Sequence, residues 1–460
     1  MASGAFLPAM LRALGEDEAL ALHVSDQRQA VPLASPLAVG ALAHDAVATA
    51  TLMALALGTT EIPDAVLSPR RIAASYRSDQ LFRLNGEPPA AWAPRSGFFA
   101  TADGWVRTHA NYPHHDSALR TLLGLESDAT PEDLARALSE WSGVELETRA
   151  AEVGAIVGAY RSADTWAKHP QAKAVAAAPL IEVTTDTVGT SQHPQPISTG
   201  FPAPLQGIRV LDLTRVIAGP VATRTLALLG ADVLRIDNPR RPEIAWQHLD
   251  TGQGKHSGLL DFAAADDLRT FHELLAGADV VVTGYRPDAL TRFGLDDDVL
   301  AASHPGLIRG RISAWGTRGP WAHRRGFDSI VQTVSGIAAI SSPEGSHHGA
   351  RPGALPAQAL DHTAGYLLAS GIMSALRRRA CSGAGGGINV SLARIAQELL
   401  AAGTTAVGED TGPPTDHTVH AETTSGDLEC AASVFTQPEL PDRYPTVGRA
   451  WGIDPARWTS

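Results

Sequence analysis

Residues 205–238 have the sequence LQGIRVLDLTRVIAGPVATRTLALLGADVLRIDN, and this stretch decides the fold. A short hydrophobic run rich in β-formers spans 208–213, and a helical pattern follows from Ala218 to Gly230. A second such run, ADVLRI, follows at 231–236. The order strand, helix, strand is typical of a parallel βαβ unit. We therefore expect a parallel sheet in this half of the chain.

The same alternation continues downstream. The patterns predict further strands at 258–262, 278–283, 307–313 and 388–390, and helices at 266–276 and 361–379. Strands that alternate with helices of this length form a doubly wound sheet with helices on both faces. The fold class that we predict is therefore α/β, with a mostly parallel sheet.

The upstream half has different patterns. GFFATADGWVRT at 97–108 predicts a β-hairpin, because Asp103-Gly104 separates two apolar runs. A stretch rich in Thr, Ser and Pro then precedes the sheet. We predict five segments, which are an N-terminal helical segment at 1–96, a small α+β domain at 97–175, a linker at 176–204, the α/β domain at 205–400 and an irregular C-terminal segment at 401–460.

Composition excludes several classes of protein. The 460 residues include 37 basic and 49 acidic side chains, a net charge of −12. Nonspecific binding to nucleic acid or to an anionic membrane needs a basic surface, so we expect neither partner, although a local cationic pocket is compatible with this balance. The two cysteines, Cys381 and Cys430, exclude a disulfide framework and a cysteine-rich zinc site.

The most apolar run, residues 37–58, contains His44 and Asp45. A charged group at the centre of a bilayer is costly, so this run indicates a buried helix and not a membrane span. The first 20 residues lack the basic region and apolar run of a secretory signal. We therefore expect a soluble, cytoplasmic protein.

The common cofactor motifs do not occur. The turn at 214–220 lacks the glycines of a dinucleotide-binding fingerprint, and Gly383–Gly387 has only part of that spacing and follows a helix. The sequence has no P-loop, no nucleophile elbow and no zinc-protease motif. The pairs His114-His115 and His347-His348 have no matching metal-ligand spacing, so we expect solvated loop histidines and no metal site.

Two features remain as candidates for chemistry. One is a group of arginines around Trp315-Gly316, namely Arg309, Arg311, Arg318, Arg324 and Arg325. It forms either a basic lip for a phosphate-bearing ligand or a set of solvated loop arginines. The other is Asp361 at the start of a long helix, which is either a reactive carboxylate or an ordinary helix cap.

The block at 205–238 resembles the opening of family III CoA-transferases, the superfamily of formyl-CoA and carnitine CoA-transferases that also includes α-methylacyl-CoA racemase. Six further blocks resemble the family in the same order. They are Gly254–Ser257 with Leu260–Phe262, Ala278–Leu295, His304–Pro320, Gly326–Asp328 with Val331-Gln332 and Ser335-Gly336, Asp361–Gly365 and Ile388–Leu392. The resemblance implies a Rossmann-like CoA-binding domain at 205–400.

The N-terminal half resembles a later portion of the same family. Residues 97–108 look like the start of its small domain, and Arg161-Ser162 with His169–Gln171 look like the end. The small domain thus precedes the CoA-binding domain, which is the reverse of the usual order. This order implies a fused, permuted or doubled arrangement, and it leaves open whether one chain completes an active site.

An internal duplication is a further possibility. His44-Asp45 with the later run 67–73 is similar to Asp361-His362 with 390–396. Alanine- and leucine-rich helices also resemble each other by chance, so both explanations stay open. Asp45 is accordingly either a relic of a duplicated nucleophile or a plain helix-start residue.

The resemblance implies a mechanism and a site. Asp361 is the nucleophile, whose attack on an acyl-CoA thioester gives a mixed anhydride and then an aspartyl-CoA thioester that charges an acceptor acid. CoA would contact the matching positions Arg215, Val216, Ala218, Lys255 and Arg286. The partners implied are an acyl-CoA and a carboxylic acid, with CoA as substrate and no other cofactor. Family members form interlocked dimers, so we expect a homodimer or a pseudo-dimer.

Two alternatives stay open. The racemase branch carries a histidine where this chain has Phe327, which cannot act as a base, so we favour transfer over an isomerase, racemase or dehydratase reaction. His362 is the only neighbouring substitute, and adjacent residues at a helix start seldom face one ligand. The second alternative follows from the reversed domain order. In this alternative the protein is a CoA-binding subunit that is incomplete without a partner.

Overall fold

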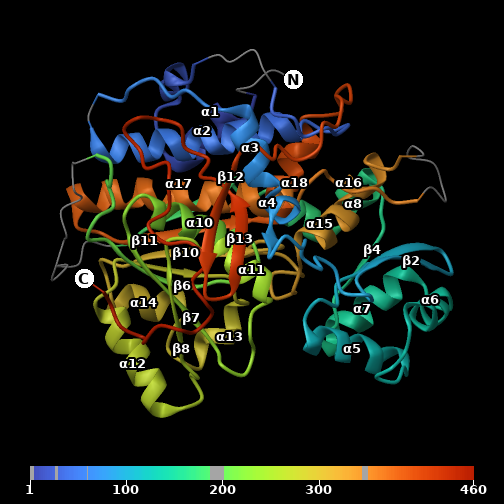
Figure 1. Ribbon diagram of the computed structural model, residues 1–460. Coiled ribbons are helices and arrows are strands. Elements are labelled where there is room, and N and C mark those ends of the chain that lie inside the picture. Colours follow the sequence, from blue (N-terminus) through green and yellow to red (C-terminus); the bar gives the residue numbers. More distant parts are fainter. Residues whose placement is uncertain (1–4, 26–29, 60, 187–200, 344–350, 460) are drawn as a thin grey trace.

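The computed structural model describes residues 5–25, 30–59, 61–186, 201–343 and 351–459 (Figure 1). A seven-stranded sheet lies at its centre, with the order β5-β11-β10-β9-β6-β7-β8. The strands are β5 (Ile181–Thr185), β6 (Arg209–Leu213), β7 (Asp232–Asp237), β8 (His256–Leu259), β9 (Val280–Thr283), β10 (Ile308–Ser313) and β11 (Gly386–Ser391). All pair in parallel except β5, which is antiparallel to β11. The α/β fold class is confirmed.

The strand order creates a crevice at one edge of the sheet. The chain runs from β6 outward to β8 and then returns to the other side of β6 as β9. The loops after β6 and β9 therefore leave in opposite directions at the carboxyl ends of neighbouring strands. Open α/β sheets bind ligands at such a switch point.

Alternate residues of the strands face two different cores. Val210 and Val280 face the core that contains α10 (Ala218–Leu228), α17 (Ala359–Ser382) and α2 (Val39–Gly58). Leu211 and Val281 face the opposite core, which contains α12 (Ala265–Ala276) and α14 (Asp297–Ser303). Figure 1 shows these layers from the N-terminal helices at the top to α12 at the bottom. The period of two is that of strands buried on both faces.

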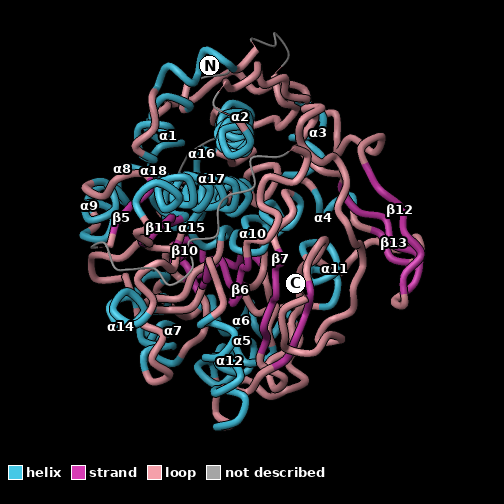
Figure 2. The backbone as a smooth tube through the Cα atoms, turned by 90° about the vertical axis from the view of Figure 1, so that its left-hand side faces the viewer, coloured by secondary structure: helices cyan, strands magenta, loops and turns pink. Residues whose placement is uncertain are grey.

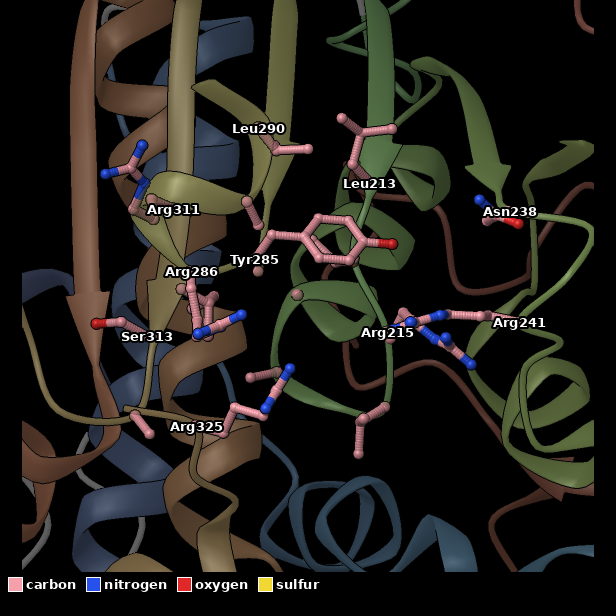
Figure 3. Close-up of a pocket in the computed structure, with 18 of the residues that line it drawn as sticks. Leu213, Arg215, Asn238, Arg241, Tyr285, Arg286, Leu290, Arg311, Ser313 and Arg325 are labelled. Carbon is pink, nitrogen blue, oxygen red and sulfur yellow. The ribbon is translucent and has the colours of Figure 1, made fainter. Parts of the chain in front are cut away.

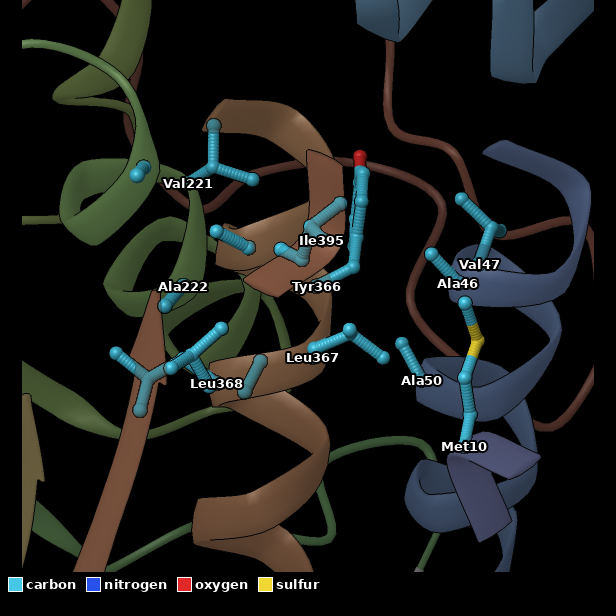
Figure 4. Close-up of a cluster of buried hydrophobic side chains, with 14 of the residues drawn as sticks. Met10, Ala46, Val47, Ala50, Val221, Ala222, Tyr366, Leu367, Leu368 and Ile395 are labelled. Carbon is cyan, nitrogen blue, oxygen red and sulfur yellow. The ribbon is translucent and has the colours of Figure 1, made fainter. Parts of the chain in front are cut away.

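The apolar helix α2 is a core helix. It is the one helix in the described part of the chain that is long and apolar enough to cross a membrane, and 89% of its most apolar window is buried. It packs against α17, and Ala46, Val47 and Ala50 lie opposite Tyr366 and Leu367 (Figures 2 and 4). The expectation of a buried helix is confirmed for this structure.

The N-terminal segment is not a separate unit. It contains α1 (Leu7–Leu14), a 3₁₀ helix (Glu18–His23), α2, α3 (Pro69–Tyr76), α4 (Ser78–Leu81) and β1 (Arg83–Leu84). Strand β1 pairs with β13 (Gly426–Ala431), which forms a hairpin with β12 (Thr418–Thr423). The prediction of an irregular segment at 401–460 was therefore wrong for 418–431. The two strands there are short and flanked by turn residues, so the sequence pattern did not indicate them.

The small domain has its own sheet and core. Strands β2 (Gly97–Thr101), β3 (Gly104–Thr108) and β4 (Val157–Ala159) pack with α5 (Pro113–Leu123), α6 (Pro131–Ser139) and α7 (Gly143–Val153). The hairpin predicted at 97–108 is present, with Thr101 opposite Gly104. Strand β4, which is only three residues long, was not predicted from the sequence.

The chain returns to the large domain through two short helices, α8 (Ala163–Lys168) and α9 (Pro170–Ala176). It then adds β5 to the edge of the main sheet, within the segment that was predicted to be a linker. The prediction of a linker was therefore wrong for 181–185, and residues 187–200 lie outside the described part. The remaining helices are α11 (Ala245–Thr251), α13 (Pro287–Thr291), α15 (Asp328–Ser335), α16 (Ile337–Ile340) and α18 (Leu392–Ala401).

The suspected duplication has a structural counterpart. Helices α2 and α17 are each followed along the chain by a shorter helix, α3 or α18. Ser68 caps α3 by accepting a hydrogen bond from the N–H of Arg71, and Ser391 caps α18 in the same way from Arg394. These serines occupy matching positions of the two similar sequence runs. The similarity of the two runs therefore extends to the way in which the two helices are capped.

Candidate active site

A cleft of about 790 Å³ lies at the carboxyl ends of the sheet, where the small domain meets the large one. Loops after β6, β7, β9 and β10 form its large-domain wall, and Tyr112, His114 and His115 come from the small domain. Eight arginines line it, namely Arg215, Arg240, Arg241, Arg286, Arg292, Arg311, Arg324 and Arg325. The cleft is therefore a basic site in an acidic chain, which suits a ligand with several negative charges.

Figure 3 shows how the basic groups converge. Arg215 and Arg241 approach from one side, Arg286 and Arg325 from the other, and the Tyr285 ring lies between them. Arg286 stands before α13, in the matched block that the sequence singled out. Because guanidinium groups bind phosphate oxygens in pairs, this arrangement can hold a diphosphate or several separate phosphates.

The loop after β6 approaches the cleft closely and is held in place. Val216 has a positive φ of 70°, which is unusual for a β-branched residue. Its N–H donates to Glu243 Oε2 at 3.2 Å, and Arg215 donates to the same carboxylate. Gly219 packs so closely on Thr214 that a Cβ at this position would lie 2.3 Å from the Thr214 Cβ. Arg215, Val216 and Ala218 all line the cleft, and their contact with CoA stays a prediction.

Glu243 connects the two domains beneath this loop. Its Oε1 accepts a hydrogen bond from the hydroxyl of Tyr112, which belongs to the small domain, at 2.5 Å. Burial alone would raise the pKa of Glu243, but the charges of Arg235 and Arg215 lower it to about 2. The carboxylate is therefore ionised at neutral pH. Neither Glu243 nor Tyr112 was expected from the sequence, because their partners are distant in the chain.

Lys255 does not lie in the cleft. Its ammonium group is buried and donates to Asp212 at 3.0 Å, to Thr223 at 2.6 Å and to the carbonyl of Pro220 at 2.9 Å. Burial lowers its pKa to about 8. The structure thus places Lys255 beneath the first loop, where it supports α10 and has no access to a ligand in the cleft. A matched sequence block could not distinguish these two positions.

Asp361 lies in the wall of the cleft at the third residue of α17. Its side chain is nearly buried, with 6% exposed. It is not a helix cap, because Asp328 performs that task from α15. Asp328 Oδ2 accepts the N–H groups of Leu360 and Asp361 at 2.9 and 3.0 Å. The helix start therefore does not need the carboxylate of Asp361 as a cap.

The two aspartates influence each other. Burial raises the pKa of Asp328 to about 6, and burial together with the charge of Asp328 raises the pKa of Asp361 well above its usual range. A carboxylate with a raised pKa is a stronger base and a better nucleophile once it is ionised.

The histidines differ from expectation. His114 and His115 are on α5 and line the cleft, so neither is a loop residue. His114 is exposed as expected, whereas His115 is buried. His347 and His348 lie outside the described residues. His362 is buried and its ring stacks on Tyr76 at 5.1 Å, so it faces the core. No group of three or more potential metal ligands occurs among the residues that the structure describes.

The five arginines of the predicted cluster do not share one position. Arg311, Arg324 and Arg325 line the cleft. Arg309 is buried and paired with Asp186 at 2.7 Å, and Arg318 is exposed outside the lining of the cleft. Arg240 and Arg241 were not predicted, although two adjacent arginines directly after the second predicted strand were a usable signal.

Part of the chain is similar to proteins of a known family. Residues 205–431 match the model of CoA-transferase family III. A probable fatty acyl-CoA transferase of Mycobacterium tuberculosis is 33% identical over 218 residues, which are 44% of this chain and 54% of that protein. A succinate–glutarate CoA-transferase of Agrobacterium fabrum is 33% identical over 43% of this chain and 53% of its own length. Residues 205–431, just under half of the chain, are thus similar to CoA-transferase family III.

The match is partial in length. The chain spans about half the length of the curated relatives that it matches. A crystal structure of a hypothetical protein from Mycobacterium tuberculosis is 32% identical, covers 44% of this chain and 58% of that one, and has a TM-score of 0.40. The 97–186 region precedes the matched residues and supplies the second wall of the cleft.

Proposed function

We propose that the protein is a CoA-transferase that moves CoA from an acyl-CoA to a free carboxylic acid. The observation that carries the proposal is the carboxylate of Asp361, which stands uncommitted to helix capping in a cleft lined by eight arginines. Arg215 and Arg286 would hold phosphates of CoA, and the backbone from Val216 to Ala218 would lie against the ligand. CoA enters as a substrate, and we propose no resident cofactor.

The proposed steps balance without an added reactant. The Asp361 carboxylate attacks the thioester carbonyl, which forms an aspartyl anhydride and releases CoA thiolate. The thiolate attacks the aspartyl carbonyl, which forms an aspartyl-CoA thioester and releases the first acid. The second acid then attacks this thioester and forms a new anhydride and thiolate, and the thiolate takes the new acyl group and restores Asp361.

Both walls of the cleft come from one chain. The small domain contributes Tyr112, His114 and His115, and the large domain contributes Asp361 and the arginines. This arrangement supports a complete site in a single chain over a subunit that needs a partner for its chemistry. Phe327, which also lines the cleft, supports transfer over proton abstraction because it has no basic group. A homodimer and a cytoplasmic location stay predictions.

The test is an exchange assay with the full chain. A panel of acyl-CoA thioesters and acids is supplied, and formation of the new acyl-CoA is followed by mass spectrometry. We expect transfer by the wild type and a loss of more than roughly 10³-fold in Asp361→Ala, as is usual when a nucleophile is removed. The matched control is Asp442→Asn, an exposed aspartate that does not line the cleft. Undiminished transfer by Asp361→Ala would refute the proposal.

A further inference from the structure

The C-terminal segment, residues 432–459, follows the residues that match the family. It is fastened at Ser257 to β8, the edge strand of the main sheet. The N–H groups of Gly452 and Asp454 donate to the hydroxyl and the carbonyl of Ser257, at 2.8 and 2.9 Å. The N–H of Ser257 donates in turn to the carboxylate of Asp454 at 2.8 Å. An edge strand has backbone groups that no neighbouring strand pairs, and the C-terminal segment is anchored on those of β8.

Trp451 stands beside this anchor and reaches the end of β7. Its indole Nε1 donates to Asp237 Oδ2 at 2.9 Å. The next residue, Gly452, has a positive φ of 68°, and a Cβ there would lie 2.6 Å from the side chain of Leu259. Only glycine fits this tight turn, so the backbone that presents the indole to Asp237 is closely defined. Asp237 is one of the described residues that line the cleft, and Trp451 is not.

Buried ionic contacts continue from Asp237 toward the first loop of the sheet. Arg235 donates to both carboxylate oxygens of Asp237, at 2.7 and 3.2 Å, and to Glu243 Oε2 at 2.9 Å. All three residues are at most 8% exposed. Among the described residues these two carboxylates are the hydrogen-bond acceptors of Arg235, whose Nη1 is buried without one. A buried charge that loses a partner is costly, so the position of Arg235 depends on both carboxylates.

Glu243 ends this series of contacts at the loop after β6. Its Oε2, which accepts from Arg235, also accepts the N–H of Val216 at 3.2 Å. A β-branched residue keeps a φ of 70°, as Val216 does, only where its surroundings hold it there. The neighbouring Arg215 is one of the side chains of the cleft (Figure 3). The relay that joins the C-terminal segment to this loop consists of Trp451, Asp237, Arg235 and Glu243.

We propose that Trp451 is a positioning residue for CoA. Through the relay it holds Val216 and Arg215 in the geometry that receives CoA, without lining the cleft itself. The inference rests on the proposed function, which makes CoA the ligand of this loop. It extends the CoA site beyond residues 205–431. It also separates binding from chemistry, because no hydrogen bond among the described residues joins the relay to Asp361.

The test compares two tryptophans of the C-terminal segment. Trp451→Phe removes the N–H that reaches Asp237 and keeps an aromatic ring. The matched control is Trp458→Phe, since Trp458 donates to the carbonyl of Leu274 at 3.2 Å and lies outside the relay. Binding of free CoA to the full chain is measured by isothermal titration calorimetry. We expect Trp451→Phe to weaken CoA binding about 3- to 10-fold, less than the loss of a direct charged contact would, because Trp451 acts through other residues. Trp458→Phe should bind CoA as the wild type does.

Exchange kinetics distinguish positioning from a loss of folded protein. Trp451→Phe should raise the KM for the acyl-CoA by a similar factor and leave kcat and the KM for the acid close to those of the wild type. A smaller fraction of folded enzyme would instead lower kcat and leave both KM values unchanged.

A double-mutant cycle tests whether Trp451 acts through the relay. Glu243→Gln interrupts the relay next to the loop, so in that background Trp451→Phe should have little further effect on CoA binding. Asp237→Asn interrupts the same relay and serves as the background if Glu243→Gln does not fold.

Three outcomes would overturn the inference. They are CoA binding by Trp451→Phe equal to that of the wild type, an equal loss in Trp458→Phe, and effects of Trp451→Phe and the relay variant that simply add. A wild type that does not bind CoA would refute the proposed function and this inference together. If Asp361→Ala abolishes transfer but Trp451→Phe binds CoA normally, only the relay is wrong. If Asp361→Ala still transfers CoA while Trp451→Phe binds it weakly, the nucleophile is wrong and the relay stands.

Discussion

Helices α2 and α17 lie side by side in the core, and each carries an aspartate in its first half (Figures 1 and 4). Asp361 of α17 lines the cleft. Asp45 of α2 is fully buried, and its Oδ2 accepts the N–H groups of Phe6 and Leu7 at 2.7 and 3.1 Å. Its Oδ1 lies 2.9 Å from Nδ1 of His44. One carboxylate is available to a ligand and the other is not.

The contacts of these two aspartates show which residue of the α17 region has the same role as Asp45. Asp45 satisfies the first N–H groups of α1 from a neighbouring helix, and Asp328 satisfies the N–H groups of Leu360 and Asp361 from α15. Asp45 is therefore the counterpart of Asp328 and not of Asp361. Its interpretation as a relic of a duplicated nucleophile has no support in its position. An aspartate near a helix start becomes available for chemistry when another residue performs the capping.

The largest expected contrast concerns Asp361→Asn. The variant should lose transfer by more than roughly 10³-fold while its melting temperature stays equal or rises, because a buried carboxylate with a raised pKa costs folding free energy. Exchange assays and thermal unfolding of the same preparation would measure both. A large drop in melting temperature would contradict the account, since it would give Asp361 a structural task.

Asp45→Ala should behave in the opposite way. Two buried N–H groups would lose their acceptor, so the free energy of unfolding should fall by about 2–5 kcal/mol. The rate per folded molecule should be close to that of the wild type. Denaturant unfolding and active-site titration would separate the two effects, and Asp45→Asn, which retains an acceptor oxygen, should lose less stability.

Asp328→Asn sharpens the comparison through pH. Removing the Asp328 charge should lower the pKa of Asp361, because that charge and burial both raise it. The acidic limb of the pH profile of kcat/KM should therefore move to lower pH, provided that the amide oxygen still accepts from the helix start. An unchanged limb would show that the two carboxyl groups do not titrate together.

The smallest effect concerns Asp79, whose pKa is raised to about 6 by burial and by Asp250. The folded state then binds this proton more tightly than the unfolded state, so stability falls as the pH rises from about 4 to 6. Asp79→Asn should remove this part of the slope, at most a few kcal/mol. Urea unfolding at pH 4.5 and 7 would detect it, and equal slopes for variant and wild type would contradict the assignment.

Local patterns predicted much of the large domain. Short hydrophobic runs separated by helical patterns predicted the parallel strands. Asp103-Gly104 between two apolar runs predicted the hairpin of the small domain. Short strands such as β4, β5 and β12 escaped, because their pairing depends on partners far along the chain. The packing of α2 against α17 was not predicted either, because the sequence of an apolar helix does not indicate which element it packs against.

The site was predicted unevenly for the same reason. Arg215, Val216, Ala218, Arg286 and Asp361 lie in the cleft because their blocks sit at strand and helix ends. Lys255 was placed there by block position alone, and only three-dimensional contacts show its pairing with Asp212. Asp328 and Glu243 act through residues that are remote in sequence, so spacing carried no signal for them.

The central claim is that Asp361 is the covalent site, and intact-mass spectrometry tests it most directly. The wild type, Asp361→Ala and Asp45→Asn would be exposed to a panel of acyl-CoA thioesters, quenched with and without hydroxylamine, and digested to locate any adduct. The account predicts an acyl or CoA adduct on the peptide that contains Asp361, in the wild type and Asp45→Asn but not in Asp361→Ala. An adduct that persists in Asp361→Ala, or CoA that binds and turns over with no adduct in any protein, would contradict it.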